Sequence, residues 1–157
     1  MPYFQSPGST PDAPHVCQPT DQAALTRVGG GRRILIVDDE PPITETLSAI
    51  FGHNGYAVRT ASSAEEAIET LAEWEPHLAI LDVMLPRMNG IELALVVRDN
   101  HPRCRLVLFS GNIGTQALAE EAAKKGNFFE ILSKPVHPLF ILDYVASLLS
   151  EPTTDFR

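Results

Sequence analysis

The organisation of this chain depends on the stretch Ile34-Leu35-Ile36-Val37-Asp38-Asp39-Glu40-Pro41. Four aliphatic residues in a row, without alternation of polar and apolar side chains, predict a β-strand that is buried on both faces. The strand must end at the three acidic residues, because adjacent carboxylates are costly in an apolar core unless they are paired or bind a cation. Pro41 and Pro42 suit the first turn of a helix, where a missing backbone N–H costs nothing. The stretch therefore predicts a buried strand that opens into an acidic cluster, a candidate cation site, beside a helix start.

The alternation of apolar strand and amphipathic helix continues along residues 32–150. The expected strands are 33–37, 56–60, 77–81, 105–109 and 128–132, and the expected helices are 42–53, 64–74, 91–100, 115–125 and 138–149. Strands that alternate with helices predict an α/β fold, a three-layer αβα sandwich around a five-stranded parallel sheet. Among the few topologies with right-handed crossovers we favour the flavodoxin-like order 2-1-3-4-5. Its functional crevice lies at the carboxyl ends of the first and third strands.

Polar residues follow four of these strands. Asp38, Asp39 and Glu40 follow the first strand, and Asp82, Ser110 and Lys134 follow the third, fourth and fifth. In the expected topology these side chains converge on one crevice. Carboxylates gathered there would raise each other's pKa and need a cation, and hard oxygen ligands favour Mg²⁺. An Mg²⁺, an ammonium and a hydroxyl donor around one carboxylate could hold a phosphoryl group, and a carboxylate can form an acyl phosphate.

These residues resemble the receiver domain of two-component response regulators, over residues 32–150. Asp38 and Asp39 match the acid pair that holds Mg²⁺, and Asp82 matches the phosphoacceptor. The resemblance implies that the carbonyl of Met84 is a further metal ligand. The segment Asp82-x-x-x-Pro86-x-Met88-x-Gly90 matches the loop after the acceptor, Ser110 the switch hydroxyl, and Lys134-Pro135 the lysine before a cis proline.

The resemblance also implies a mechanism and partners. A histidine kinase or a histidine phosphotransfer protein presents phosphohistidine, Asp82 takes the phosphoryl group, and Ser110 and Lys134 bind it. The new charge biases a two-state surface that contacts a downstream protein. The module is then no enzyme beyond its own Mg²⁺-dependent phosphorylation and slow dephosphorylation. The apolar surplus of 138–149 favours a partner or homodimer surface formed by the fourth helix, fifth strand and fifth helix.

One position departs from the family pattern. Family members carry Tyr or Phe three residues before the lysine, where it rotates with the switch hydroxyl, and this chain has Ile131. Either a bulge lets the Phe129 ring rotate with the switch hydroxyl in its place, or this aromatic rotation is missing. We therefore expect altered output coupling with the phosphorylation chemistry intact.

Composition indicates the nature of the two ends of the chain and limits its possible functions. Residues 1–31 are rich in proline and poor in large aliphatics, which predicts a disordered tail, and 151–157 form a second tail that is too short for an output domain. A formal charge of −8 argues against direct DNA binding. The resemblance together with this short C-terminal segment implies a single-domain receiver. No apolar run could span a bilayer and no secretory signal is found, so we expect a cytoplasmic protein with reduced Cys17 and Cys104.

Two other classes of function stay open from the residues. A receiver fold that has lost phospho-switching could act as a constitutive protein-interaction module, and Ile131 is the main support for that. An enzyme on the same topology would be a flavin protein or an aspartate-nucleophile phosphatase. The first needs a hydroxyl- and glycine-rich loop after the first strand, and the second needs two aspartates spaced two residues apart there. Asp38-Asp39-Glu40 meets neither requirement.

Overall fold

The computed structural model describes residues 29–111, 115–127 and 129–150. Most of the expected N-terminal tail, and all of the C-terminal one, lie outside these ranges. Strands and helices alternate strictly along the described part. The elements are β1 (Arg33–Val37), α2 (Pro41–His53), β2 (Ala57–Ala61), α3 (Ala64–Leu71), β3 (Leu78–Asp82), α4 (Gly90–Asn100), β4 (Arg105–Ser110), α5 (Thr115–Lys124), β5 (Glu130–Ser133) and α6 (Pro138–Ser150).

The five strands form one parallel sheet in the order β2-β1-β3-β4-β5, so the predicted fold class and strand order are confirmed. β1 lies between β2 and β3, with Val37 in register with Ala61 of β2 and Leu81 of β3. Residues 34–37 are buried, as their unbroken apolar run predicts. The carboxyl ends of β1 and β3 are therefore neighbours at one edge of the sheet, where the winding direction reverses.

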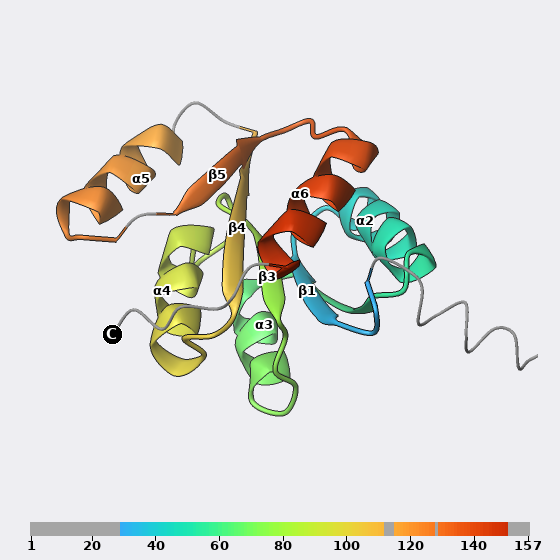
Figure 1. Ribbon diagram of the computed structural model, residues 1–157. Coiled ribbons are helices and arrows are strands. Elements are labelled where there is room, and N and C mark those ends of the chain that lie inside the picture. Colours follow the sequence, from blue (N-terminus) through green and yellow to red (C-terminus); the bar gives the residue numbers. More distant parts are fainter. Residues whose placement is uncertain (1–28, 112–114, 128, 151–157) are drawn as a thin grey trace, which may run out of the picture.

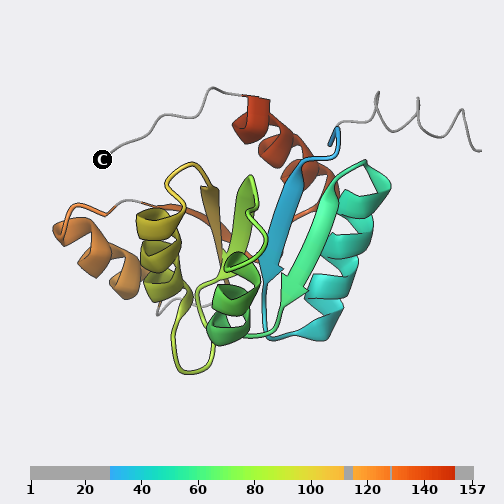
Figure 2. The same ribbon diagram turned by 90° about the horizontal axis from the view of Figure 1, so that it is seen from below.

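Helices cover both faces of the sheet, with α2 and α6 on one side and α3, α4 and α5 on the other (Figures 1 and 2). Each face has its own core. Phe51 of α2 and Ile141 of α6 pack on one face, together with Ile36 of β1. Ala67 of α3 and Leu93 of α4 pack on the other face. This double cover explains why the central strands carry no polar face.

Helix starts follow local signals in the sequence. Pro41 begins α2, and the Ser63 hydroxyl caps α3 by accepting from the backbone N–H of Glu66 at 3.1 Å. Asn89 and Glu92 form a capping box at the start of α4. These contacts place the first turns of the helices close to the strand ends that carry the polar residues.

Some predicted boundaries were wrong. Helix α3 was expected to reach residue 74 but ends at Leu71. The backbone N–H of Glu73 donates to the carbonyl of Thr70 at 3.2 Å, and this tighter turn closes the helix. β5 spans Glu130–Ser133 instead of 128–132, and β2 begins at Ala57 instead of residue 56. Both strands lie further toward their carboxyl ends than expected. Register with the neighbouring strand decides where a strand begins and ends, and a short apolar run does not show this register.

Candidate functional site

Asp38 is a buried carboxylate at the end of β1, with 3% of its surface exposed. Its backbone N–H donates to the carbonyl of Ala61 at 3.1 Å. Its Oδ1 accepts from the backbone N–H of Glu40 at 2.9 Å, and its Oδ2 accepts from the ammonium of Lys134 at 2.9 Å. Both carboxylate oxygens are therefore bonded, which is what a buried acid requires.

Asp82 is the last residue of β3 and is 5% exposed. Its Oδ1 accepts from the backbone N–H of Met84 at 3.2 Å, and its Oδ2 lies 3.4 Å from Lys134 Nζ. The loop that follows is held against the sheet, because Val83 N–H donates to the carbonyl of Phe109 and Val83 C=O accepts from Gly90. A Cβ at Gly90 would lie 2.2 Å from the carbonyl oxygen of Asp82, so only glycine lets α4 begin this close to the strand end.

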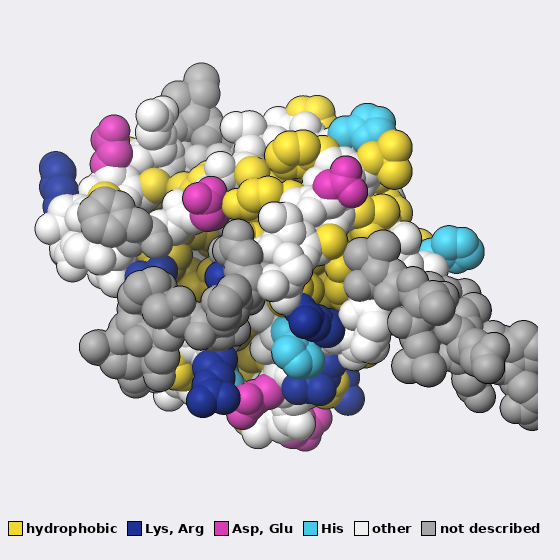
Figure 3. Space-filling model, in the orientation of Figure 1, with side chains coloured by type: hydrophobic (Ala, Val, Ile, Leu, Met, Phe, Trp, Pro, Cys, Tyr) yellow, Lys and Arg dark blue, Asp and Glu magenta, His cyan; other side chains and the backbone are white. Residues whose placement is uncertain are grey.

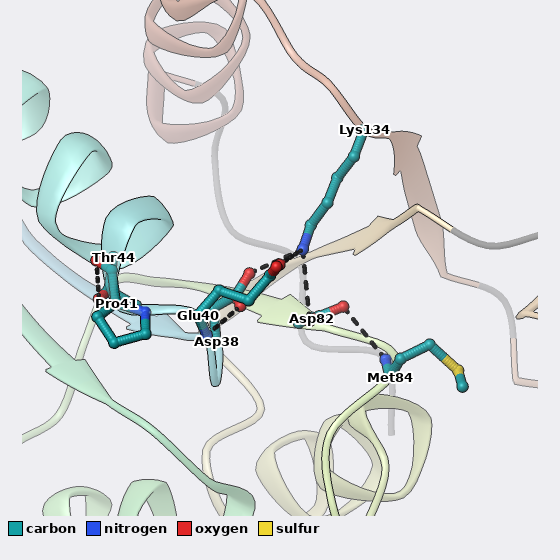
Figure 4. A network of polar contacts seen from close by, with 7 residues as sticks. All are labelled: Asp38, Glu40, Pro41, Thr44, Asp82, Met84 and Lys134. Carbon is teal, nitrogen blue, oxygen red and sulfur yellow. Dashed lines mark hydrogen bonds and ion pairs between the residues drawn. The ribbon is translucent and has the colours of Figure 1, made fainter.

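Lys134 joins the carboxylates of two strands. It follows β5, its backbone N–H donates to the carbonyl of Ser110 at 2.8 Å, and its peptide bond to Pro135 is cis. Its Nζ lies 2.9 Å from Asp38, 3.4 Å from Asp82 and 3.6 Å from Glu40. Figure 4 shows the lysine reaching across the edge of the sheet to all three acids. Segments almost a hundred residues apart in sequence therefore meet at one ammonium group.

The site carries more negative than positive charge. Burial raises the pKa of Asp82, and the charge of Asp38 raises it further, while Lys134 and the bond from Met84 act in the opposite direction. Burial alone would lower the pKa of Lys134, but the hydrogen bond to Asp38 and the charges of Asp82 and Asp38 outweigh burial, so that this pKa is raised. The lysine is therefore charged at neutral pH, and one cation among three carboxylates leaves room for a second one.

Asp38, Glu40 and Asp82 form a candidate metal site, because each offers an oxygen within 4.8 Å of the others. Hard carboxylate oxygens with an excess of negative charge suit Mg²⁺. The predicted ligand Asp39 is exposed and is not part of this group, whereas its neighbour Glu40 is. Met84 points its exposed side chain away from the acids and contributes its backbone N–H to Asp82 (Figure 4). The ligand set that the sequence predicted, with Asp39 and the Met84 carbonyl, stays a prediction.

Ser110 lies at the end of β4, 8% exposed, and its hydroxyl is hydrogen-bonded to the hydroxyl of Thr115 at the start of α5. Thr115 was not predicted from the sequence, because a hydroxyl five residues further along the chain gives no sign that it turns back to β4. A hollow of about 570 Å³ borders this pair, and Ile131 and Lys134 line it as well. The predicted switch residues Ser110 and Ile131 are thus neighbours of the same hollow.

Phe129, the other predicted switch residue, does not lie beside Ser110. It precedes β5 and packs against the core on the side of α4, with the guanidinium of Arg98 4.3 Å from its ring centroid. It is not among the residues that line the hollow beside Ser110. The described residues therefore bring Ile131, and not Phe129, to the hollow beside the Ser110 hydroxyl, and the switch role of both residues stays a prediction.

Comparison with known proteins agrees with this geometry. The family model of the response regulator receiver domain matches residues 34–146. This chain belongs to the response regulator receiver family. The chemotaxis protein CheY of Thermotoga maritima is 32% identical over 114 residues, which are 72% of this chain and 93% of that protein. The nitrogen assimilation regulatory protein NtrX of Azorhizobium caulinodans is 38% identical over 104 residues, 65% of this chain.

A solved receiver structure has the same fold. The response regulator protein TrrA from Thermotoga maritima, in complex with Mg(2+)-BeF, superposes with a TM-score of 0.64 at 28% identity and covers 74% of this chain and 98% of that one. Several relatives are longer, and the receiver chain spans only 22% of NtrX.

The general role of this receiver follows from its family. It is a phosphoacceptor module of two-component signalling and not a classical enzyme, and receivers of this kind interact with histidine kinases. Its acidic pocket contains Asp38, Glu40 and Asp82 around Lys134. None of the described helices is both long and apolar enough to cross a lipid bilayer.

Proposed function

We propose that this receiver accepts a phosphoryl group on Asp82 from a phosphohistidine of a histidine kinase or a histidine phosphotransfer protein, and then signals through a phosphorylation-dependent protein surface. The observation that carries the proposal is the position of Lys134 Nζ, 2.9 Å from Asp38 and 3.4 Å from Asp82. A lysine held there can pair with a phosphoryl oxygen as soon as one appears on Asp82.

In the proposed reaction an oxygen of the Asp82 carboxylate attacks the phosphorus, the bond from phosphorus to the imidazole nitrogen breaks, and the imidazole leaves with the electron pair of that bond. Asp82 must be ionised to attack. Lys134 compensates part of the charge on the phosphoryl oxygens, and the bond from Met84 N–H orients the acceptor carboxylate. Hydrolysis of the acyl phosphate by water returns the free carboxylate and inorganic phosphate.

Mg²⁺ is the cofactor in this proposal. Asp38 and Asp82 would hold it, with Asp39 and the Met84 carbonyl as the family pattern implies, and Glu40 is a further acid within reach. The fit is supported by three carboxylates that share a single ammonium and by the raised pKa of Asp82. When bound, the ion supplies positive charge that neutralises phosphoryl oxygens.

The proposed response runs from Ser110 to the outer surface. Ser110 would leave Thr115 to bond with a phosphoryl oxygen, and α5 would move because Thr115 is its first residue. The first turn of α6 carries Leu139 and Phe140, which are 65% and 52% exposed. Figure 3 shows apolar side chains over the region of α6. We propose this α5-β5-α6 surface as the site of a downstream protein or of a second copy, with no direct DNA contact.

The competing proposal is a constitutive interaction module that has lost phospho-switching. Ile131 favours it, since an aliphatic side chain borders the hollow beside Ser110 where the family carries an aromatic ring. The two proposals differ in whether Asp82 is modified at all.

The deciding experiment is intact-mass measurement after incubation with acetyl phosphate, a small phosphodonor, and Mg²⁺. The receiver should gain one phosphoryl mass, and Asp82→Asn should abolish that gain. Asp99→Asn, which makes the same chemical change on the exposed face of α4, is the matched control and should leave it intact. A protein that gains no mass, or gains it equally with Asp82→Asn, would be the interaction module.

A second experiment concerns the partners. Pull-downs with the receiver in the presence and absence of beryllofluoride, a phosphoryl mimic, should retain different proteins in the two states. Identical sets in both states would contradict a phosphorylation-dependent surface.

A further inference from the structure

A basic cavity lies at the edge of the sheet opposite to Asp82. It has a volume of about 950 Å³ and is lined by residues at the start of β1, before β3, at the start of β4 and at the end of α6. Its basic residues are Arg32, Arg33, Arg103 and Arg105. None of them takes part in the phosphoacceptor site, so this cavity is independent of the function proposed above.

The charge of the lining is opposite to that of the whole chain. Among the described lining residues there are four arginines and one acidic residue, Glu75, whereas the formal charge of the chain is −8. Figure 3 shows Lys, Arg and His side chains in the lower part of the view, beneath the end of α6, with Asp and Glu side chains at their lower border. A concave site that concentrates one sign of charge attracts ligands of the other sign.

Two of the arginines are held in place by backbone carbonyls. Arg32 donates to the carbonyl of Leu149 at the end of α6, and Arg33 Nε donates to the carbonyl of Glu75 at 2.5 Å. Neither bond uses a carboxylate, so the positive charge is not neutralised by an ion pair there. Each guanidinium has five N–H donors, and one bond to a carbonyl leaves others for a ligand.

The pKa of His77 is sensitive to the positive charge of the cavity. Its Nδ1 accepts from the backbone N–H of Arg33 at 2.9 Å, and so its proton in the neutral form is on Nε2. Burial lowers its pKa, and the charges of Arg33 and Arg32 lower it further. Cys104 adds no negative charge, because burial and the charge of Glu75 raise the pKa of its thiol to about 12. The cavity therefore stays positive at neutral pH.

We propose that this cavity binds a small phosphate-bearing ligand of the nucleotide class. Guanidinium groups match phosphate oxygens in geometry and charge. The cavity is at the upper end of the size range of small-molecule sites, and Pro76, Pro102 and Leu149 add apolar wall for a base or sugar. A nucleic-acid strand is a poorer occupant, because outside this concave site the acidic remainder of the chain would repel an extended phosphate backbone.

The test is isothermal titration calorimetry of the full chain with ADP, with inorganic pyrophosphate and with adenosine, in EDTA so that Asp82 cannot take part through a metal. ADP should bind with a Kd below about 1 mM, pyrophosphate more weakly and adenosine not at all. Arg103→Gln should weaken ADP binding about tenfold, since one charge-assisted hydrogen bond is lost. This arginine is exposed and makes no ion pair with another described residue, so the variant should fold normally.

The controls separate a built site from general attraction. Arg59→Gln makes the same charge change on β2, outside the cavity, and should leave ADP binding unchanged. Arg103→Gln should leave the mass gain on Asp82 unchanged, which keeps this test distinct from the phosphoacceptor test. A titration with a single-stranded oligonucleotide is a further arm of the test. The proposal is overturned if ADP does not saturate, if Arg59→Gln and Arg103→Gln weaken binding equally, or if the oligonucleotide binds and ADP does not.

Discussion

Among single residues, Asp82 is a carboxylate with an unfavourable electrostatic environment. Its carboxylate is buried beside Asp38, and both effects raise its pKa. A group whose pKa is higher in the folded state than in the unfolded state stabilises the fold at low pH, and this contribution is lost as the pH rises through the folded pKa. At neutral pH and without metal, the ionised Asp82 therefore destabilises the receiver.

The first prediction concerns the neutral variant. In EDTA at neutral pH, Asp82→Asn should have a higher Tm than the wild type, because burial and repulsion by Asp38 no longer act on a charge. The difference should shrink as the pH falls and the wild-type acid takes up its proton. Thermal unfolding followed by circular dichroism measures this, with Asp99→Asn as the exposed control. A lower Tm for Asp82→Asn would mean that, in the wild type, attraction between the Asp82 carboxylate and Lys134 outweighs the burial of its charge and the repulsion by Asp38.

The second prediction concerns the lysine. Lys134→Ala leaves three carboxylates without their shared ammonium, and loss of one partner of a buried pair costs about 3 kcal/mol. The free energy of unfolding in EDTA should fall by about that amount. Mg²⁺ should restore part of it, since a bound cation replaces the lost charge, and at a concentration of about 100 times Kd it adds about 2.7 kcal/mol. Urea titrations with and without Mg²⁺ measure both. Equal stability of variant and wild type in EDTA would contradict the charge argument.

At the scale of elements, the start of α4 is built against the end of β3. Gly90 N–H donates to the carbonyl of Val83 at 2.9 Å, and the capping box of Asn89 and Glu92 holds the first turn. The helix can begin there only because residue 90 has no Cβ. The position of the Asp82 carboxylate therefore depends on a helix start eight residues later.

The third prediction follows from this contact. Gly90→Ala forces the backbone of Asp82 and Val83 apart and should lower the free energy of unfolding by about 1–3 kcal/mol. It should also slow phosphorylation of Asp82, because the carboxylate moves away from Lys134. Gly52→Ala is the matched control, since a Cβ there meets nothing within 4 Å inside helix α2, and it should stabilise by about 0.5–1 kcal/mol. Similar losses in both variants would rule out the close approach as the cause.

At the scale of the whole molecule, the receiver has three regions of different chemistry. The acidic pocket and the basic cavity lie at opposite edges of the sheet, and the exposed apolar turn of α6 lies on one of its faces. Phe140 stacks on Tyr144, with 5.9 Å between ring centroids, so this apolar turn is a defined surface in the free chain. An exposed aromatic ring of this kind is a typical anchor for a protein partner, in line with the surface proposed above.

The fourth prediction concerns that surface. Beryllofluoride and Mg²⁺ should shift the receiver toward a dimer in sedimentation velocity experiments, and Phe140→Ser should weaken this association. Ile68→Ser on α3 removes a less exposed apolar side chain from the other face of the sheet and should have no effect. If the wild type stays monomeric with beryllofluoride, the surface serves a different protein, and the pull-down described above should then lose its partners with Phe140→Ser.

Much of the fold was predictable because burial is encoded in the order of apolar residues. Unbroken aliphatic runs such as 34–37 belong to strands covered on both faces, and strand–helix alternation leaves a parallel sheet as the simplest solution. The strand ends were less predictable, as β5 shows, because register depends on the neighbouring strand.

The sequence by itself determined the fold class and the set of acids, hydroxyl and lysine at the strand ends, because these follow from periodicity and from the geometry of parallel sheets. It narrowed the strand order to a few topologies, and the structure has the one that was favoured. Only the tertiary structure decided which of the consecutive acids turns toward Lys134, that Thr115 binds Ser110, and that arginines from separate segments line one cavity. These contacts join residues through loops and crossovers, and the direction in which a backbone leaves a strand is decided by packing and not by the local pattern of residues.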